Sequence, residues 1–436
     1  APICTIDAFC LDLLRKHFQA LDIPPDFSPA DPGSVETLRA AALAETLERA
    51  YADPDFCAFA DLYGKGRSDK AAGETILHTY DFLRALPDYD RKLDEFLAPW
   101  KAERGFDKTC WHDLLLAEAA RDAKAGRELF CAALSDCKND LVLARIEAEN
   151  KGKTDAARAK GVAGANDKFA EPLERLENAA ALLGEVERLA EAGEWTPLYD
   201  RLTPYVLGME PLPGLKGMKK RLTGEHKAAV KTRADEAAGL FGQILELISC
   251  SEDEAEADRL AALPRLQALF AAVRDFDARF AAKKQERKLL EFSDFEHQAL
   301  RLLRGPDGTP TPLCETIRQN YAAVMVDEYQ DTNALQDALY RCLASPAGDN
   351  LFLVGDLKQS IYRFRQADPS IFREKLDTWP LLEGEAARSR PAEGVPGRNA
   401  LLALDANFRS APEVVRGINF LFEQLMTPAL GDTAYG

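Results

Sequence analysis

The apolar residues near the start of the chain recur at helical spacing. They lie one or four positions apart and so share one face of a helix; they are Phe9, Leu13, Leu14 and Phe18. Thr5 or Asp7 is the expected N-cap. The sequence predicts a helix that begins near residue 5, followed by a loop and domain boundary in the proline-rich stretch 22–34.

The long middle of the chain shows only helical patterning. From about residue 36 to 285 it is rich in Ala, Leu, Glu, Arg and Lys. Its apolar positions recur at intervals of three and four, as at Leu173, Leu176, Ala180 and Leu183. We predict an almost purely helical region.

Strand signals are short apolar runs at 322–326, 351–355 and 400–404. Each run ends in polar residues and precedes sequence that suits a helix, which is typical of buried parallel strands with helical crossovers. The predicted fold class is therefore α/β, with a parallel-sheet lobe whose chain is interrupted by a large all-helical insertion.

Two adjacent acids follow the first predicted strand. Ligands of a doubly wound sheet bind beyond the carboxyl ends of its strands, and Asp327 and Glu328 lie at that edge. Neighbouring carboxylates repel each other unless a cation or a polarised water lies between them. The pair thus favours a metal-assisted phosphate reaction, in which one acid holds Mg²⁺ and the other orients the attacking water. In the alternative, both acids are solvated and Asp331 caps the next helix.

The second predicted strand ends in an amide and a run of aromatic and basic residues. Gln359 is suited to contact a phosphate or a water without adding charge. Tyr362 and Phe364 alternate with Arg363 and Arg365. Such residues offer flat faces for bases and charges for a backbone, as single-stranded nucleic acid requires. In the alternative, Tyr362 and Phe364 are core residues of a strand.

The third predicted strand is followed by Asn-Phe-Arg-Ser. Arg409 at such an edge is able to neutralise a phosphate. Ser410 is positioned to cap the helix that follows. An arginine in this position is otherwise a surface residue or an ion-pair partner.

Composition limits the class of protein. A chain of 436 residues is too long for one compact core, so two or three domains are expected. No apolar stretch is long enough to span a membrane, and the first residues do not resemble a signal peptide. The nine cysteines are scattered and form no C-x-x-C pair, which argues against a disulfide framework or a zinc site and favours a cytoplasmic location.

The formal net charge of −17 excludes a surface that is basic throughout, so contact with DNA must be local. One candidate is the stretch 216–233, which holds seven basic residues and one acid, Glu225. A basic helix or loop there suits the phosphates of duplex DNA. The alternative is a solvated helix face that balances acidic neighbours.

Several segments together resemble a known family. In their order and spacing, VDEYQDTN (326–333), GDLKQSIYRFRQAD (355–368) and NFRS (407–410) are similar to motifs II, III and IV of the superfamily 1 DNA helicases of the UvrD, Rep and PcrA type. TIDAFC (5–10) resembles the family's segment that lines the DNA path, and LLEFSDFEHQALRLL (289–303) resembles the stretch that re-enters the first motor lobe. The wording is most similar to the AddA subunits of bacterial helicase–nucleases and to their relative RecB.

The resemblance implies a RecA-like first motor lobe. Its N-terminal piece is expected at 1–22, a helical insertion resembling a 1B domain at 23–285, and the remainder with motifs II, III and IV at 286–436. Motif-bearing similarity is confined to residues 1 to about 22 and 286 to 430. Across the helical middle the similarity is one of position only.

The resemblance also implies roles for single residues. Asp327 would bind Mg²⁺, and Glu328 would be the catalytic base for ATP hydrolysis. Gln359 would report the state of the γ-phosphate to the DNA side, Arg409 would contact that phosphate, and Phe408 would stack near the adenine.

The implied DNA-binding residues are Thr5, Tyr362, Phe364 and Arg365. Two positions depart from the family pattern. Asp7 stands where the family usually has His, which puts an acid near a phosphate path. Phe364 replaces the more usual Trp, which keeps a stacking face of smaller area.

The function implied is that of an ATP- and Mg²⁺-dependent helicase that moves 3′ to 5′ on single-stranded DNA within a helicase–nuclease of double-strand break repair and recombination. Its expected partners are single-stranded and duplex DNA and an AddB-like or RecC/RecD-like subunit. Two other readings are a UvrD-type helicase without a nuclease, or the RecB subunit, and a catalytically silent module for DNA binding or assembly.

A phosphate-binding loop of the form G-x-x-x-x-G-K-[ST] is missing from the sequence. The nearest match, ENKGKTDAAR (149–158), lacks the first glycine and follows a helical run. We therefore expect the chain to be a fragment without motif I and the C-terminal lobes, and we expect its own ATPase activity to be near background.

Overall fold

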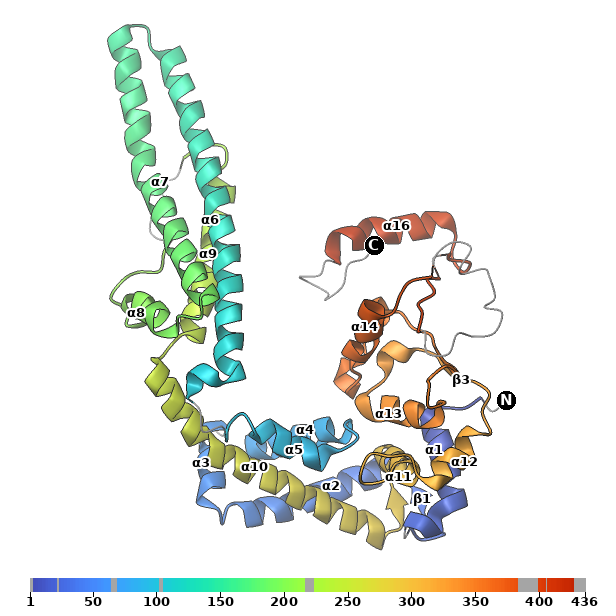
Figure 1. Cartoon of the computed structure of the whole chain (residues 1–436). Helices are drawn as coiled ribbons and strands as arrows, with labels where there is room; N and C mark the ends of the chain where they lie inside the picture. Colours follow the sequence, from blue (N-terminus) through green and yellow to red (C-terminus); the bar gives the residue numbers. More distant parts are fainter. Residues whose placement is uncertain are drawn as a thin grey trace. The chain divides into compact units, whose positions relative to one another are not determined.

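The computed structural model of the chain describes residues 3–21, 23–63, 69–101, 105–215, 223–382, 399–404 and 406–426. Helices dominate these residues, and their short strands pair in parallel, as the predicted class requires. The chain separates into two compact units (Figure 1). Unit 1 comprises Ala1–Glu95 and Arg265–Gly436, and unit 2 comprises Phe96–Pro264.

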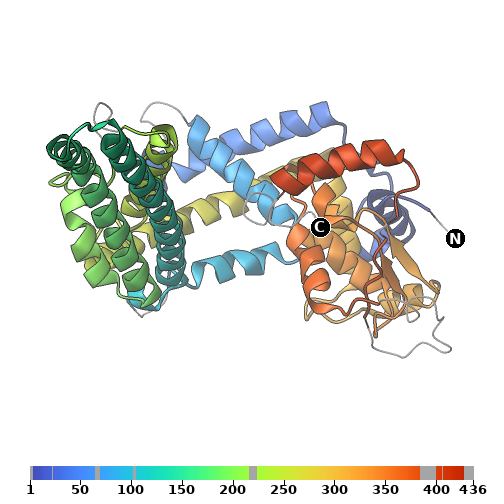
Figure 2. The same ribbon diagram turned by 90° about the horizontal axis from the view of Figure 1, so that it is seen from above.

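Unit 2 is helical throughout its described secondary structure. Helices α6 (Cys110–Lys151) and α7 (Asp155–Glu191) form a long antiparallel hairpin, and α9 (Lys227–Leu247) packs along α6 (Figure 2). The 3₁₀ turn η2 (Phe106–Lys108) and helix α8 (Trp195–Val206) complete the unit. The expected helical middle of the chain is thus confirmed.

The core of unit 2 lies between these helices. Phe130, Leu176 and Phe241 are fully buried, and Trp195 donates its indole N–H to the carbonyl of Cys250 at 3.2 Å. The hairpin turn follows α6 directly, and Thr154 caps α7. The Gly-Lys-Thr sequence at this turn therefore lies between two helices, as its rejection as a phosphate-binding loop requires.

Unit 1 contains one helical layer built from segments far apart in the chain. Its core includes the buried residues Ile76, Tyr80, Phe276 and Phe280. The helices are α2 (Pro32–Ala50), α3 (Pro54–Tyr63), α4 (Lys70–Arg84), α5 (Tyr89–Leu97) and the C-terminal part of α10 (Glu252–Glu286). Helix α10 continues from unit 2 into unit 1 at Pro264.

A second core of unit 1 surrounds α1 (Ile6–His17). Leu14, Phe295 and Leu335 are buried here. The partners of α1 are α11 (Phe292–Leu303), α12 (Pro312–Arg318) and α13 (Ala334–Leu343). Thr5 is the N-cap of α1, and its hydroxyl accepts from the N–H of Ala8 at 3.2 Å. The first predicted helix and one of its two expected caps are confirmed.

Two short parallel strand pairs complete unit 1. Strand β1 (Ser28–Pro29) pairs with β2 (Leu289–Leu290), and β3 (Val324–Val326) pairs with β4 (Leu351–Leu353). The third strand, expected at 400–404, is wrong within the described residues 399–404, where only an isolated bridge joins Leu381 and Leu401. Leu404 is 87% exposed, so this run lacks the neighbouring strands that its apolar pattern suggested.

A buried group of charges joins three helices of unit 1. Asp294, at the start of α11, accepts from Lys284 of α10 at 2.6 Å and from Arg84 of α4 at 2.7 Å. Lys284 also contacts Glu291 at 2.8 Å. Burial of such charges is tolerated because each has an opposite partner. The group fixes the first turn of α11 against α4.

The two units cut across the segments predicted from sequence. Residues 23–95 and 265–285 belong to unit 1, although their amphipathic pattern is the same as that of unit 2. Hydrophobic spacing identifies a helix but not the core that it joins. The assignment of 23–285 as a whole to an insertion domain stays a prediction.

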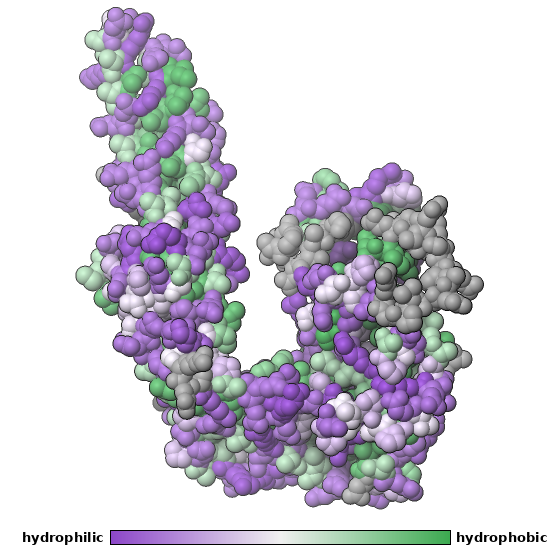
Figure 3. All heavy atoms as spheres, viewed as in Figure 1, coloured by the Kyte–Doolittle hydropathy of each residue, from purple (hydrophilic) through white to green (hydrophobic). Residues whose placement is uncertain are grey.

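The outer surface is mostly hydrophilic (Figure 3). A hydrophobic area follows the hairpin of unit 2, where Val142, Leu143 and Ile146 of α6 are about half exposed. None of the described helices has both the length and the apolar character needed to cross a membrane. All nine cysteines are free thiols.

Candidate functional site

The carboxyl end of β3 presents two acids in succession. Val326 is buried, whereas Asp327 and Glu328 are exposed. Glu328 has the left-handed backbone conformation, with φ 50° and ψ 41°, and leads into the 3₁₀ turn η3 (Tyr329–Asp331). Asp327 Oδ1 accepts from the N–H of Glu328 at 3.0 Å. A left-handed glutamate costs about 1–2 kcal/mol, so the surrounding bonds must hold it in place.

Backbone hydrogen bonds join the ends of β3 and β4. The N–H of Val354 donates to the carbonyl of Val326, and the N–H of Tyr329 donates to that of Val354, each at 2.9 Å. Both strands therefore end at the same edge, as predicted from the carboxyl-end rule. The expected Asp331 helix cap is wrong: α13 is capped by Asn333, whose side chain and that of Gln336 form a reciprocal box.

Asp356 organises the turn after β4. Its carboxylate accepts from the backbone N–H of Lys358 and from the side-chain amide of Gln359, both at 3.0 Å, across the 3₁₀ turn η4 (Leu357–Gln359). Burial acts to raise the pKa of Asp356, but these hydrogen bonds and the Lys358 charge outweigh it and hold the pKa below its usual value. Gln359 is thus held at the strand end by a charged partner.

Gln330 connects the two strand ends through its side chain. It is fully buried, donates from Nε2 to Glu328 Oε2 at 2.7 Å, and accepts at Oε1 from the N–H of Asp356 at 3.0 Å. A Cβ on Gly355 would lie 2.6 Å from Gln330 Oε1, so this approach requires glycine. Sequence reasoning missed Gln330; the available signal was the glycine after β4, since such a glycine indicates close approach of another group.

The aromatic and basic run lies on the 3₁₀ turn η5 (Arg363–Arg365) and is exposed. Tyr362 is 36% and Phe364 73% exposed, so their alternative role as strand core residues is wrong. Their ring centroids are 5.8 Å apart. Arg365 Cζ lies 5.3 Å from the Tyr362 ring and 5.6 Å from that of Phe364. Two aromatic faces and one guanidinium therefore form a single exposed cluster.

Phe408 and Arg409 lie before helix α16 (Pro412–Leu425). Phe408 is 94% exposed. Asn407 Oδ1 accepts from the N–H groups of Arg409 and Ser410, and Ala411 is the N-cap of α16, so the predicted Ser410 cap is wrong. Among the described residues, no hydrogen bond, ion pair or ring contact joins Phe408 or Arg409 to the strand ends. Their roles at a nucleotide site stay predictions.

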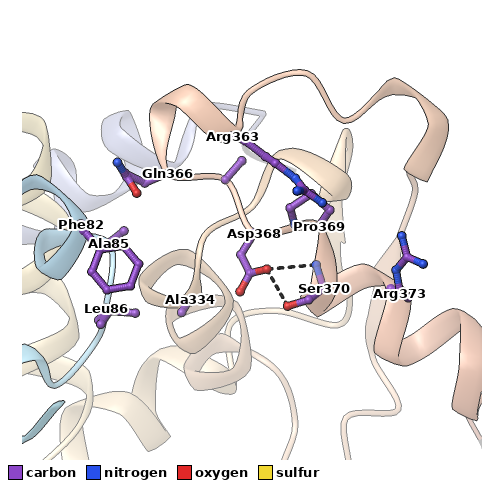
Figure 4. Close-up of a pocket in the computed structure, with 11 residues that line it drawn as sticks. Phe82, Ala85, Leu86, Ala334, Arg363, Gln366, Asp368, Pro369, Ser370 and Arg373 are labelled. Atoms are coloured by element: carbon purple, nitrogen blue, oxygen red, sulfur yellow. Dashed lines mark hydrogen bonds between the residues drawn. The ribbon is translucent and has the colours of Figure 1, made fainter. Parts of the chain in front are cut away.

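Two cavities flank the turn that carries Tyr362 and Arg365. The first, of about 610 Å³, has α4 on one side and residues 363–373 on the other (Figure 4). There Asp368 caps α14 (Pro369–Thr378) by accepting from the N–H of Ser370 at 3.0 Å. The second cavity, of about 500 Å³, is lined by Tyr362 and Arg365 themselves and by side chains of α1, α2, α4, α11 and α13. We call it the α4–α11 cavity.

The described part of the basic stretch 216–233 is neutralised by acids of unit 2. His226 contacts Asp140 at 2.8 Å, and Arg233 pairs with Asp136. Lys231 pairs with an acid of its own helix, Asp235. These contacts favour the alternative of a charge-balanced surface. Residues 216–222 lie outside the described residues, so their proposed contact with duplex DNA stays a prediction.

Glu296 of α11 is a buried acid in the wall of the α4–α11 cavity. Burial raises its pKa to about 7, although Gln336 donates to it at 2.8 Å. Because the folded pKa exceeds the unfolded value of 4.5, the stability that the neutral acid contributes is complete below pH 4.5 and is lost as the pH rises through about 7.

We expect Glu296→Gln to raise the free energy of unfolding at pH 8, on the order of 3 kcal/mol, and to change it little at pH 4.5. The amide retains an acceptor for Gln336 and cannot ionise. Thermal melts at both pH values check this, with exposed Glu315→Gln as the control. An equal effect of Glu296→Gln at both pH values contradicts the explanation.

Comparison with known proteins agrees with this geometry. Residues 215–380 match the UvrD/REP helicase N-terminal domain. The whole chain is 32% identical over 446 residues to the AddA subunit of an ATP-dependent helicase/nuclease from Pelotomaculum thermopropionicum, covering 32% of that relative. It is 32% identical over 448 residues to the protein of the same name from Geobacillus thermodenitrificans, covering 33%, and 29% identical over 446 residues to that from Acetivibrio thermocellus, covering 32%.

These alignments correct one expectation and limit another. Similarity runs through the helical middle, which the motifs alone had left as a match of position. The chain spans about a third of the length of the curated relatives it matches. Residues 215–380 therefore belong to the UvrD/REP helicase N-terminal domain family, and the chain along its full length is homologous to part of the AddA subunit of ATP-dependent helicase/nucleases.

Proposed function

We propose that the chain is part of the first motor lobe of an ATP-dependent DNA helicase that acts in a helicase–nuclease. The observation that carries this proposal is the edge at which β3 and β4 end together. Gln330 links Glu328 at the first strand end to the turn that holds Gln359 at the second. Such a link between a hydrolytic acid and a phosphate-sensing amide is what coupling of ATP hydrolysis to movement requires.

Asp327 is the proposed ligand of a nucleotide-bound Mg²⁺. The ion takes one or two carboxylates, and its other ligands are phosphates and waters. Asp327 is exposed at the strand end, and its Oδ1 accepts only a backbone N–H. No group of three or more His, Cys, Asp and Glu among the described residues forms a protein-only metal site, which agrees with a metal that arrives with ATP. When bound, Mg²⁺ neutralises charge on the phosphates.

Glu328 is the proposed base that orients the attacking water. Its carboxylate is exposed, and the Gln330 amide fixes one of its oxygens. Gln359 and Arg409 are proposed to contact the γ-phosphate, and Phe408 the adenine. Thr5, Tyr362, Phe364 and Arg365 are proposed to contact single-stranded DNA. Movement from 3′ to 5′ and a role in recombination rest on the resemblance to superfamily 1 helicases.

A further protein is proposed as a partner. The relatives are named as one subunit of an ATP-dependent helicase/nuclease, which implies at least one other polypeptide in their complex. An AddB-like or RecC/RecD-like protein is the proposed partner of the full-length protein.

Strand displacement by the full-length protein tests the proposal. We expect it to unwind a duplex with a 3′ single-stranded tail only when ATP and Mg²⁺ are both present. ATP-dependent unwinding of a duplex with a 5′ tail alone would contradict the polarity. Absence of DNA-stimulated ATP hydrolysis would contradict the motor itself.

We expect Tyr362→Ala and Phe364→Ala each to weaken binding of single-stranded DNA by about 5- to 100-fold, because loss of one stacked base contact costs about 1–3 kcal/mol. Fluorescence anisotropy of a labelled oligonucleotide measures the effect in the absence of ATP. Phe420→Ala removes an aromatic ring of similar exposure on α16 and serves as the control. Equal losses in all three variants would show that the exposed cluster has no special role.

A further inference from the structure

The α4–α11 cavity has walls from six segments of unit 1. Besides Tyr362 and Arg365, it is lined by Asp7 of α1, Arg39 of α2, Tyr80 and Arg84 of α4, and Asp331 at the end of η3. Its volume of about 500 Å³ lies in the range of small-ligand pockets. Tyr362 and Arg365, which belong to the exposed cluster, also line it. A strand stacked on the cluster would therefore have one of its nucleotides beside the cavity.

The charges in the wall do not suit a phosphate. Two arginines are already paired, Arg39 with Asp81 at 2.7 Å and Arg84 with Asp294 at 2.7 Å. Five acids line the cavity against three arginines; they are Asp7, Asp81, Glu291, Glu296 and Asp331. A phosphodiester would be repelled by this excess of carboxylates. The part of a nucleotide that fits is the base.

Unpaired polar atoms in the wall indicate what the base must offer. Asp331 Oδ1 and the Tyr80 hydroxyl are buried, and neither has a hydrogen-bond partner among the described residues. No described side chain donates to the half-buried carboxylate of Asp7. The wall therefore has acceptors at two carboxylates, and a buried acceptor without a donor costs free energy. Beside them, Tyr362 and the Arg365 guanidinium offer faces on which a base stacks.

We infer that the α4–α11 cavity receives one base of the single strand and prefers bases with an exocyclic amino group over thymine. Adenine, cytosine and guanine carry such a donor, whereas thymine presents carbonyl oxygens on both sides of its single N–H. Those oxygens would face the carboxylates of Asp7 and Asp331. The inference rests on the proposed binding of single-stranded DNA and adds base selectivity to it.

Binding of oligo(dC) and oligo(dU) of equal length to the whole chain provides the test. The two bases differ only in an amino group against a carbonyl and its ring proton, and mildly alkaline buffer keeps cytosine neutral. We expect oligo(dC) to bind about 5- to 10-fold more tightly, as one hydrogen bond to a carboxylate would give. Oligo(dT) should match oligo(dU), because the extra methyl group does not meet the carboxylates.

Asp331→Asn and Asp7→Asn locate the effect. An amide offers its own donor to a carbonyl, so each variant should lower the preference for oligo(dC) to about twofold or less without weakening oligo(dU) binding. Asp12→Asn, on the exposed face of α1, is the matched control and should keep the preference. Thermal melts of each variant show whether the fold is retained.

The outcomes separate the inference from the proposed function. Equal binding of oligo(dC) and oligo(dU) by the unmodified chain overturns the inference and leaves DNA binding intact. A preference that survives in both Asp7→Asn and Asp331→Asn overturns the assignment to this cavity. If no oligonucleotide binds, both the inference and the proposed DNA contact fail.

Discussion

In the full-length protein, Glu328→Gln is expected to lower DNA-stimulated kcat for ATP hydrolysis by about 10²- to 10⁴-fold, the usual contribution of a general base. The glutamine side chain has almost the same shape, and its oxygen still accepts from Gln330, which lies 2.7 Å from Glu328 Oε2. The substitution therefore removes the basic oxygen and keeps the local structure. Steady-state ATPase assays at saturating DNA measure the change.

The control for Glu328→Gln is Glu315→Gln on α12, a surface acid paired with Arg318. It should leave kcat unchanged. The KM for ATP should change little in Glu328→Gln, because the residue acts on the attacking water and not on nucleotide binding. Equal kcat values for Glu328→Gln and the unmodified protein would show that another group activates the water.

Asp294→Asn is expected to lower the free energy of unfolding of unit 1 by about 3–5 kcal/mol, the usual cost of removing one partner from a buried ion pair. Lys284 and Arg84 would lose their shared carboxylate while remaining buried. Hydrogen exchange should rise first in α4, α11 and the C-terminal part of α10. Asp12→Asn breaks an exposed pair with Lys16 and should cost less than about 1 kcal/mol.

The effect of Asp294 should also depend on pH. Burial acts to raise its pKa, but the charges of Lys284 and Arg84 outweigh burial and hold the pKa below the usual 3.8. The stability that the carboxylate contributes is therefore present above about pH 4 and is lost as the pH falls through the lowered pKa. The unmodified chain and Asp294→Asn should converge in acid. A constant difference down to strongly acidic pH would contradict a charge-based role.

Sequence patterning predicted the local elements well where one periodicity dominated. The helix capped by Thr5 and the strands before Asp327 and after Asn350 are found where expected, because a buried apolar run and a cap are local properties. The strand expected at 400–404 is absent from the described residues there, because a strand also needs a neighbour that the run itself does not specify. Partition of similar helices between two units likewise depends on distant packing.

The candidate site was predictable in its residues but not in its connections. Position after a strand placed Asp327, Glu328 and Gln359 at one edge, and the alternation of aromatic and basic residues identified Tyr362 and Phe364. Gln330 escaped notice because a buried glutamine inside a polar segment has no periodic signal. Its role depends on Gly355, which lies far along the chain and admits the amide only in the folded state.

The left-handed backbone at Glu328 has a consequence for protein engineering. A search for stabilising substitutions would select this position early, because glycine or asparagine adopts φ 50° at lower cost than glutamate. Such a change would improve thermal tolerance and at the same time delete the proposed base. Consensus or design methods that score stability alone would therefore inactivate the protein at this residue, and position 328 should be held fixed in any thermostabilised variant.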